Sequence, residues 1–380
     1  MTGLPEQLLD LVRDRRVVPF VGAGFSFVAG FPGWIELLRH VCADVAPTDD
    51  FDAVVKSCSN DPLRIAEYLL VRSGGNIGPI RHQMSSALRT PASFFSSAHV
   101  DLANLHLPVI YTTNFDELIE ETYRRLGLSV NTICNARDLA LARRDTVEVV
   151  KFHGDLRYDD TLVLTESSFH SRLDLESPLD LKFRGDILGR SLLFIGYGFG
   201  DINVRAIWFK LMKLMRDVPL DERPASFIIR LRVDPVLEAL DRAVGLTTVT
   251  LDPSGAARTP ADRQRLLERF MLELTFAAPS GPTPAEPLPM FASPGLVREA
   301  TELVSANPRR LEPDDERVLD ALKRRELHDD VREDMDGLMT TFADRRPRGS
   351  LADFRRAIAL NYAMNYGDRF ALSRSSHGRV

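Results

Sequence analysis

Short apolar runs alternate along this chain with longer segments in which apolar residues return every three or four positions. The first run is 17–21 (VVPFV), and similar runs rich in β-branched and aromatic residues occupy 108–113, 147–152, 191–196, 226–231 and 247–251. Turn residues bound each run, which is typical of buried strands. The helical repeat between them predicts helices that include 34–45, 61–72, 116–127 and 201–215.

Strands that are apolar throughout and alternate with helices predict a parallel sheet with helices on both faces. The fold class is therefore α/β, with a doubly wound, mostly parallel sheet. Residues 278–289 (APSGPTPAEPLP) are rich in proline and small residues, which indicates a linker. Only helical patterns follow it. We expect a nucleotide-binding domain over 1–277, a linker over 278–290 and a small helical C-terminal module over 291–380.

Composition and charge argue against several classes of protein. The net charge of −6 gives no basic surface of the kind that nucleic-acid binders use, and no P-loop GxxxxGK[ST] is present. We therefore expect neither direct nucleic-acid binding nor ATP hydrolysis. No secretion signal and no bilayer-length apolar run is visible, so we expect a cytoplasmic protein without membrane contact. The three cysteines lie far apart, which argues against disulfides and a four-cysteine zinc site.

Four polar or glycine-rich stretches follow the expected strands directly. They are 22–26 (GAGFS), 112–116 (TTNFD), 153–154 (HG) and 196–201 (GYGFGD). The carboxyl ends of parallel strands border the ligand crevice of a doubly wound sheet, and glycine turns there admit an anion to backbone amides. Each stretch alone has a structural alternative: a tight turn, a helix cap or a core histidine. Together, and in this order, they indicate a ligand site.

These residues and their order resemble the sirtuin (Sir2) catalytic domain, and more closely the Sir2-like domains of bacterial antiphage defence proteins. The stretch 22–26 with Gly30 and Pro32 matches the family's GAG-x-S-x-x-x-G-x-P loop, and 112–116 matches its T-x-N-x-D motif. His153-Gly154 matches the catalytic His-Gly, and 196–198 takes the place of a later G-T-S loop. The resemblance covers about residues 15–255 and implies a sirtuin-like Rossmann fold.

The resemblance also implies that NAD⁺ is the substrate, while the number and spacing of the cysteines lead us to expect that no zinc is used. Asn114 and His153 would be the catalytic residues, Asn114 orienting water and the nicotinamide ribose and His153 acting as general base. The turn 22–26 would bind the phosphates, and Trp34 would cover the nicotinamide pocket. The implied NAD-binding residues are Gly22, Ala23, Gly24, Ser26, Trp34, Thr112, Asp116, Gly196, Gly198 and Asp201.

The sequence departs from the sirtuin deacylases in three places. Their Asp-Phe-Arg after the Gly-x-Pro is Gly33-Trp34-Ile35 here, and 155–190 holds no cysteine for their zinc module. Arg230 stands where the family often uses asparagine for a ribose. These departures favour an NAD⁺ glycohydrolase that releases nicotinamide and ADP-ribose and depletes NAD in antiphage defence. The alternatives are an NAD-dependent protein deacylase and a non-catalytic sensor of NAD or ADP-ribose.

An unrestrained NADase would drain its own cell, so we expect control by assembly or by a partner. The C-terminal segment carries more apolar positions than a lone exposed helix does. They are Val318, Leu319, Leu322, Leu327, Val331, Met335 and Leu338. Packing onto the first domain is an equally good explanation of these residues. The resemblance implies a homo-oligomer, with a companion protein such as a HerA-type ATPase or a short Argonaute.

Overall fold

The computed structural model places most of the chain in two compact units. The described residues are 4–90, 96–144, 146–199, 202–219, 223–278, 290–306, 317–318, 321–322 and 325–326. The first unit comprises Met1–Phe94 and Leu107–Leu267, and the second comprises Phe95–His106 and Glu268–Val380. None of the helices in these ranges combines the length and apolar character needed to cross a bilayer.

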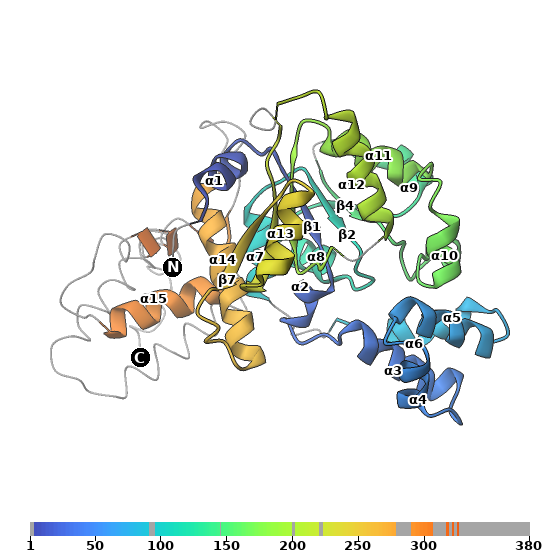
Figure 1. The fold of residues 1–380 in the computed structure, drawn as a ribbon. Helices are drawn as coiled ribbons and strands as arrows, with labels where there is room; N and C mark the ends of the chain where they lie inside the picture. Colours follow the sequence, from blue (N-terminus) through green and yellow to red (C-terminus); the bar gives the residue numbers. More distant parts are fainter. Residues whose placement is uncertain are drawn as a thin grey trace, which may run out of the picture. The chain divides into compact units, whose positions relative to one another are not determined.

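A sheet of seven strands forms the centre of the first unit (Figure 1). The strands are β1 (Val17–Val21), β2 (Val109–Thr112), β3 (Val130–Ile133), β4 (Val147–Lys151), β5 (Ser191–Ile195), β6 (Ser226–Arg232) and β7 (Leu246–Asp252). Their order is β3-β4-β2-β1-β5-β6-β7, and every neighbouring pair is parallel. The predicted α/β class with a parallel sheet is confirmed. β3 was not predicted, because this edge strand is half exposed and its centre is polar.

Aromatic side chains fill the space between one face of the sheet and two helices, α11 (Pro178–Ile187) and α12 (Ile202–Leu214). Phe20 of β1 and Tyr111 of β2 both contact Phe183 of α11, with ring centroids 5.5 and 4.8 Å apart. Phe194 of β5 packs edge-on against Trp208 of α12. The central strands are thereby buried on this face, which explains their continuous apolar runs.

The other helices of the first unit lie between or beside the strands. They are α1 (Glu6–Arg13), α2 (Ala23–Phe27), α8 (Leu118–Arg125), α9 (Ala136–Leu141), α10 (Glu166–Ser171) and α13 (Pro235–Ala243), with a short 3₁₀ turn η1 (Asp159–Thr161). Several begin at the caps that their sequences provide. The Asp234 carboxylate, for example, accepts hydrogen bonds from the amides of Val236 and Leu237 at the start of α13.

Four helices form an insert between β1 and β2. They are α3 (Trp34–Val45), α4 (Phe51–Ser57), α5 (Pro62–Arg72) and α6 (Ile77–Ala87). Asp61 caps α5 by accepting from the Leu63 amide at 2.9 Å, as the Asp-Pro sequence predicts. The insert has its own apolar core, which also includes Phe115 and Leu118. It is therefore anchored to the segment that follows β2.

Two glycine turns pack directly against each other where β1 and β5 end. The Gly24 amide donates to the Gly196 carbonyl at 2.9 Å, and the Gly22 amide donates to Ile195 at the same distance. A Cβ added to Gly22 would lie 2.6 Å from the Gly196 oxygen, and one added to Gly196 would lie 2.2 Å from the Phe25 nitrogen. Gly196 also has a φ of +62°. Only glycine fits these positions.

The second unit joins α7 (Ser97–Asn104) to the last part of α14 (Pro260–Ala277) and to α15 (Pro294–Ala306). The Asn104 side chain binds both the N–H and the carbonyl of Phe291, each at 2.8 Å. The Ser293 hydroxyl donates to the Asp101 carboxylate at 3.0 Å. Residues 95–106 thus group with the C-terminal residues, although they lie inside the expected first domain. The expected domain boundaries stay a prediction.

The predicted C-terminal apolar positions are only partly within the described ranges. Val318 and Leu322 are buried in a cluster that includes Leu272 and Leu296. The others, Leu319, Leu327, Val331, Met335 and Leu338, lie outside the described residues, as does most of the expected linker.

The contact between the glycine turns generates a stability prediction. We expect Gly196→Ala to lower the free energy of unfolding by roughly 1–3 kcal/mol or more, because the new methyl group overlaps the Phe25 amide and the φ angle is positive. Gly198→Ala is the matched control, because this exposed glycine has no atom within 4 Å of its Cβ position. Urea unfolding of both variants measures the difference. Equal stability of the two variants would contradict the packing argument.

Candidate functional site

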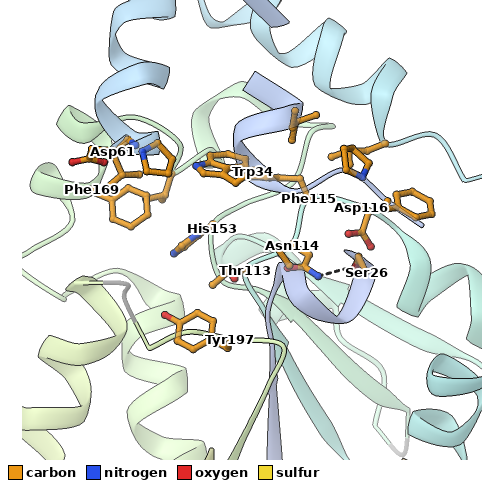
Figure 2. Close-up of a pocket in the computed structure, with 18 of the residues that line it drawn as sticks. Ser26, Trp34, Asp61, Thr113, Asn114, Phe115, Asp116, His153, Phe169 and Tyr197 are labelled. Atoms are coloured by element: carbon orange, nitrogen blue, oxygen red, sulfur yellow. Dashed lines mark hydrogen bonds between the residues drawn. The ribbon is translucent and has the colours of Figure 1, made fainter. Parts of the chain in front are cut away.

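A cavity of about 540 Å³ lies at the carboxyl ends of the central strands (Figure 2). Ala23 and Ser26 line it after β1, Asn114 and Asp116 after β2, and His153 after β4. Tyr197 after β5 closes the opposite side. The helical insert contributes Trp34, Leu37 and Asp61, and α10 contributes Glu166, Phe169 and His170. The predicted strand-end stretches therefore meet at one cavity.

Asn114 is held in one orientation by the turns after β1 and β2. Its backbone amide donates to the Thr112 hydroxyl at 3.0 Å, and that hydroxyl donates to the Val21 carbonyl. Its side-chain Nδ2 donates to the Gly22 carbonyl at 3.2 Å and to the Ser26 hydroxyl at 3.0 Å. A carbonyl only accepts hydrogen bonds, so Gly22 fixes which end of the amide faces the turn.

The Asn114 Oδ1 atom is consequently left on the other side of the amide. It is buried, and no described residue donates a hydrogen bond to it. Buried polar atoms in native proteins almost always have a partner, so an acceptor without one at a cavity is a feature of ligand sites. Oδ1 is suited to accept from a hydroxyl group or from a water molecule.

Asp116 is a buried carboxylate on the same loop. The Ser26 hydroxyl forms a hydrogen bond with it, and the Leu118 amide donates to its Oδ1 at 3.2 Å. Burial nevertheless raises the pKa of Asp116, although Ser26 and Lys151 act against the shift. Ser26 thus links the Asn114 amide to the Asp116 carboxyl, and the three side chains form one connected group (Figure 2).

His153 stands on a tight turn after β4. Gly154 has a φ of +88°, and a Cβ there would lie 2.1 Å from the Thr161 carbonyl oxygen, so the residue after His153 must be glycine. The His153 ring packs edge-on against Phe169 of α10, with centroids 4.9 Å apart. Its exposed fraction is 8%, and it lines the cavity. The motif therefore places a nearly buried imidazole beside Asn114 and Tyr197.

Much of the cavity wall is aromatic. Trp34 stacks on Phe115 with ring centroids 5.9 Å apart and an interplanar angle of 21°. Phe169 and Tyr197 complete this lining around His153. Sequence reasoning missed Phe115, Phe169 and Tyr197 as lining residues. Phe115 and Tyr197 stand inside the motifs 112–116 and 196–201, and Phe169 ends the stretch 164–169 (LTESSF), whose sequence is similar to that of defence NADases.

Lys151 is a further residue that the motifs did not single out. It is fully buried at the end of β4, and its Nζ donates to the carbonyls of Phe115 and Asp116 at 3.2 and 2.8 Å. The carboxylates of Glu120 and Asp155 each lie 3.5 Å from Nζ. Burial alone would lower the pKa of Lys151, but these carboxylates outweigh it and raise the pKa, so the side chain stays an ammonium.

Several predicted site residues are not among the residues that line the cavity. Thr112 is buried behind Asn114, and the amides of Gly22 and Gly24 donate to protein carbonyls. Gly198 is exposed and away from the lining, and Asp201 lies outside the described residues. Arg230 does not reach the cavity either. Its guanidinium pairs with Asp241 through two contacts of 2.7 Å.

Metal sites and disulfides both depend on how the histidine, cysteine and carboxylate side chains of the described ranges are grouped. Within those ranges no three His, Cys, Asp or Glu side chains are grouped so as to hold an ion. The three cysteines are free thiols, two of them buried.

Comparison with known proteins connects this geometry to a family. Residues 108–249 match the family model of the SIR2-like domain. The NAD(+) hydrolase ThsA of Cytobacillus dafuensis is 26% identical over 217 residues, which are 56% of this chain and 41% of that protein. ThsA of Bacillus cereus (strain MSX-D12) is 26% identical over 195 residues, 51% of this chain and 39% of that protein.

A third relative is Defense-associated sirtuin 2 of Bacillus subtilis, which is 25% identical over 220 residues, 56% of this chain and 21% of that protein. The chain thus spans about two fifths of the length of the two ThsA proteins and about one fifth of the length of the Bacillus subtilis protein. Residues 108–249 are thus similar to the SIR2-like domain, and this range contains β2 to β6 of the all-parallel sheet together with Asn114, Asp116, His153 and Tyr197 of the cavity lining.

Proposed function

We propose that this chain is an NAD⁺ glycohydrolase, which cleaves NAD⁺ to nicotinamide and ADP-ribose. The observation that carries the proposal is the buried Asn114 Oδ1, an acceptor without a protein donor among the described residues, in the same cavity as His153. The relatives named NAD(+) hydrolase support the choice of substrate. NAD depletion in antiphage defence is part of the proposal and is supported by the name of the Bacillus subtilis relative.

The proposed reaction needs little covalent chemistry from the protein. The nicotinamide ring of NAD⁺ carries a positive charge, so it leaves readily and the sugar passes through an oxocarbenium-like state. The site must hold the ribose, exclude bulk water and admit one attacking water. In the proposed arrangement Asn114 Oδ1 accepts from that water or from a ribose hydroxyl, and His153 takes up the proton.

The aromatic walls suit the departing ring. Trp34 and Phe115 offer a stacked, planar surface, and Asp116 stands next to it with polar groups for an amide. The carboxylates of Asp61 and Glu166 in the same lining favour a cation. In the turn 22–26, Ala23 and Ser26 are the members that line the cavity, so we assign to them the contact with the ligand phosphates.

Assembly and control belong to the same proposal. We propose a homo-oligomer whose activity changes when a companion protein binds, and a cytoplasmic location. Deleting the residues after Pro289 would not test self-assembly on its own, because the deletion also removes Phe291 and Leu296 from the packed second unit. Sedimentation of the intact chain with and without NAD⁺ measures the mass directly. A monomer under both conditions would contradict self-assembly.

Release of nicotinamide is the primary test. Purified protein incubated with NAD⁺ should release nicotinamide and ADP-ribose without any peptide, because the proposed nucleophile is water. The same incubation with an acetyl-lysine peptide separates the alternatives. Release only with peptide would identify a deacylase, and binding of NAD⁺ or ADP-ribose without release would identify a sensor.

Two substitutions test the assigned roles. We expect His153→Ala and Asn114→Ala each to reduce kcat for NAD⁺ cleavage by about 100-fold or more, the usual size of a lost general base or positioning group. His82→Ala is the matched control, because this exposed histidine of α6 lies outside the cavity lining. Circular dichroism checks that the fold is kept. Full activity of both site variants would overturn the assignment.

Asp116 generates a prediction on stability and pH. Its pKa is raised in the folded chain, so its ionisation favours unfolding. This cost is absent below the ordinary pKa, grows as the pH rises from the ordinary value toward the shifted value, and is complete above the shifted value. We therefore expect Asp116→Asn to raise Tm more at pH 7 than at pH 4 while it impairs NAD⁺ cleavage.

The control for Asp116 is a buried aspartate that has a charged partner. Asp180 lies 2.7 Å from the Arg172 guanidinium, and both side chains are buried. Asp180→Asn should lower Tm at pH 7, because it leaves Arg172 without a counter-charge. Thermal unfolding at the two pH values compares the variants. A lower Tm for Asp116→Asn at neutral pH would show that the carboxylate stabilises the fold.

A further inference from the structure

Lys151 connects the two catalytic segments of the proposed site. It ends β4, two residues before His153, and it is paired in the sheet with Thr112, two residues before Asn114. Its side chain is 0% exposed. An ammonium carries three donors, and two of them bind the carbonyls of Phe115 and Asp116. One side chain therefore holds the backbone of the loop after β2 from the strand that precedes His153.

The carboxylates around Lys151 extend this connection. Glu120 belongs to α8, which begins directly after the loop, and Asp155 follows the His153-Gly154 turn. Asp155 is itself held by Arg157 through two contacts of 2.9 and 3.0 Å. Four segments therefore meet at one buried cation: the end of β4, the loop after β2, α8 and the turn after His153.

The carbonyls that Lys151 binds belong to Phe115 and Asp116, the two residues that follow Asn114. Their position sets where Phe115 stacks on Trp34 and where Asp116 meets Ser26. We propose that Lys151 is a positioning residue, which sets Asn114 and the Trp34–Phe115 stack relative to His153. This inference rests on the proposed NAD⁺ cleavage for its kinetic test only, because the same geometry has a spectroscopic readout.

Removal of the ammonium alone would leave Glu120 buried without a counter-charge, and such losses are costly. The test variant is therefore Lys151→Met with Glu120→Gln, which keeps the volume and removes one charge of each sign. The matched control is Lys182→Met with Glu148→Gln. Lys182 is also an ion-paired lysine of the first unit, 2.6 Å from Glu148 and 2.9 Å from Asp186. Neither partner lines the cavity, whereas Lys151 binds carbonyls of two lining residues.

The first measurement is steady-state NAD⁺ cleavage. We expect the Lys151 double variant to lose about 100-fold in kcat, the loss that a displacement of about 1 Å causes, with a much smaller change in KM. The Lys182 double variant should keep wild-type kcat even if its Tm falls. Lys151→Arg keeps the buried charge but spreads its donors over a planar group, so it should fold and show a smaller loss of kcat.

The second measurement does not depend on activity. The chain has two tryptophans, Trp34 and Trp208, so Trp208→Phe leaves Trp34 as the single tryptophan, which can be excited apart from the tyrosines. In that background the Lys151 double variant should shift the Trp34 emission maximum, because the surroundings of the indole change when the stack with Phe115 moves. The Lys182 control should show wild-type emission.

The two measurements separate the failure of this inference from the failure of the proposed function. Wild-type kcat together with wild-type Trp34 emission in the Lys151 double variant would overturn the positioning role, as would a loss of kcat equal to that of the Lys182 control. If the wild-type protein releases no nicotinamide, the proposed function fails, and the Trp34 emission alone then tests the positioning role of Lys151. Should the double variant not fold, Lys151→Arg provides both measurements.

Discussion

The site depends on a contact between two backbones, in which the turn after β1 lies against the turn after β5 with no space for a Cβ atom. This contact fixes the carbonyl of Gly22, which orients the amide of Asn114, and it fixes Ser26, which binds both Asn114 and Asp116. The polar part of the cavity is thus built outward from main-chain atoms, which are the least mobile atoms of a protein. Side chains that are hydrogen-bonded to fixed main-chain atoms need few further contacts to hold their positions.

The electrostatics of the site are divided between two levels. At the cavity, Asp116 is buried and accepts hydrogen bonds, and burial raises its pKa, so its ionisation is costly. Behind the cavity, Lys151 is surrounded by carboxylates and carbonyl oxygens that keep it charged. Active sites often combine these two features: ion-paired supporting residues such as Lys151 stabilise the fold and offset the free-energy cost of a buried functional carboxylate such as Asp116.

The sequence was sufficient to predict the parallel sheet, because buried parallel strands have continuous apolar runs. It was also sufficient to predict that the motifs lie together at one cavity, because the carboxyl ends of parallel strands all face one edge of the sheet. It failed at β3, whose edge position removes the apolar signal. The close contact of Gly22 and Gly24 with Gly196 was not predicted, because glycine signals close approach of the backbone but not what approaches it. The role of Gly22 and Gly24 in binding phosphates stays a prediction. Lys151 reaches the site through tertiary packing, which leaves no local pattern.

The pairing of Asn104 with Phe291 has a consequence for the way the chain is made. The two residues are 187 positions apart, so the Asn104 side chain meets Phe291 only after nearly all of the described chain has left the ribosome. Contacts of such long range are slow to form, and segments that await them are exposed to chaperones and proteases in the meantime. The contacts between residues 96–106 and 290–306 therefore form late in synthesis.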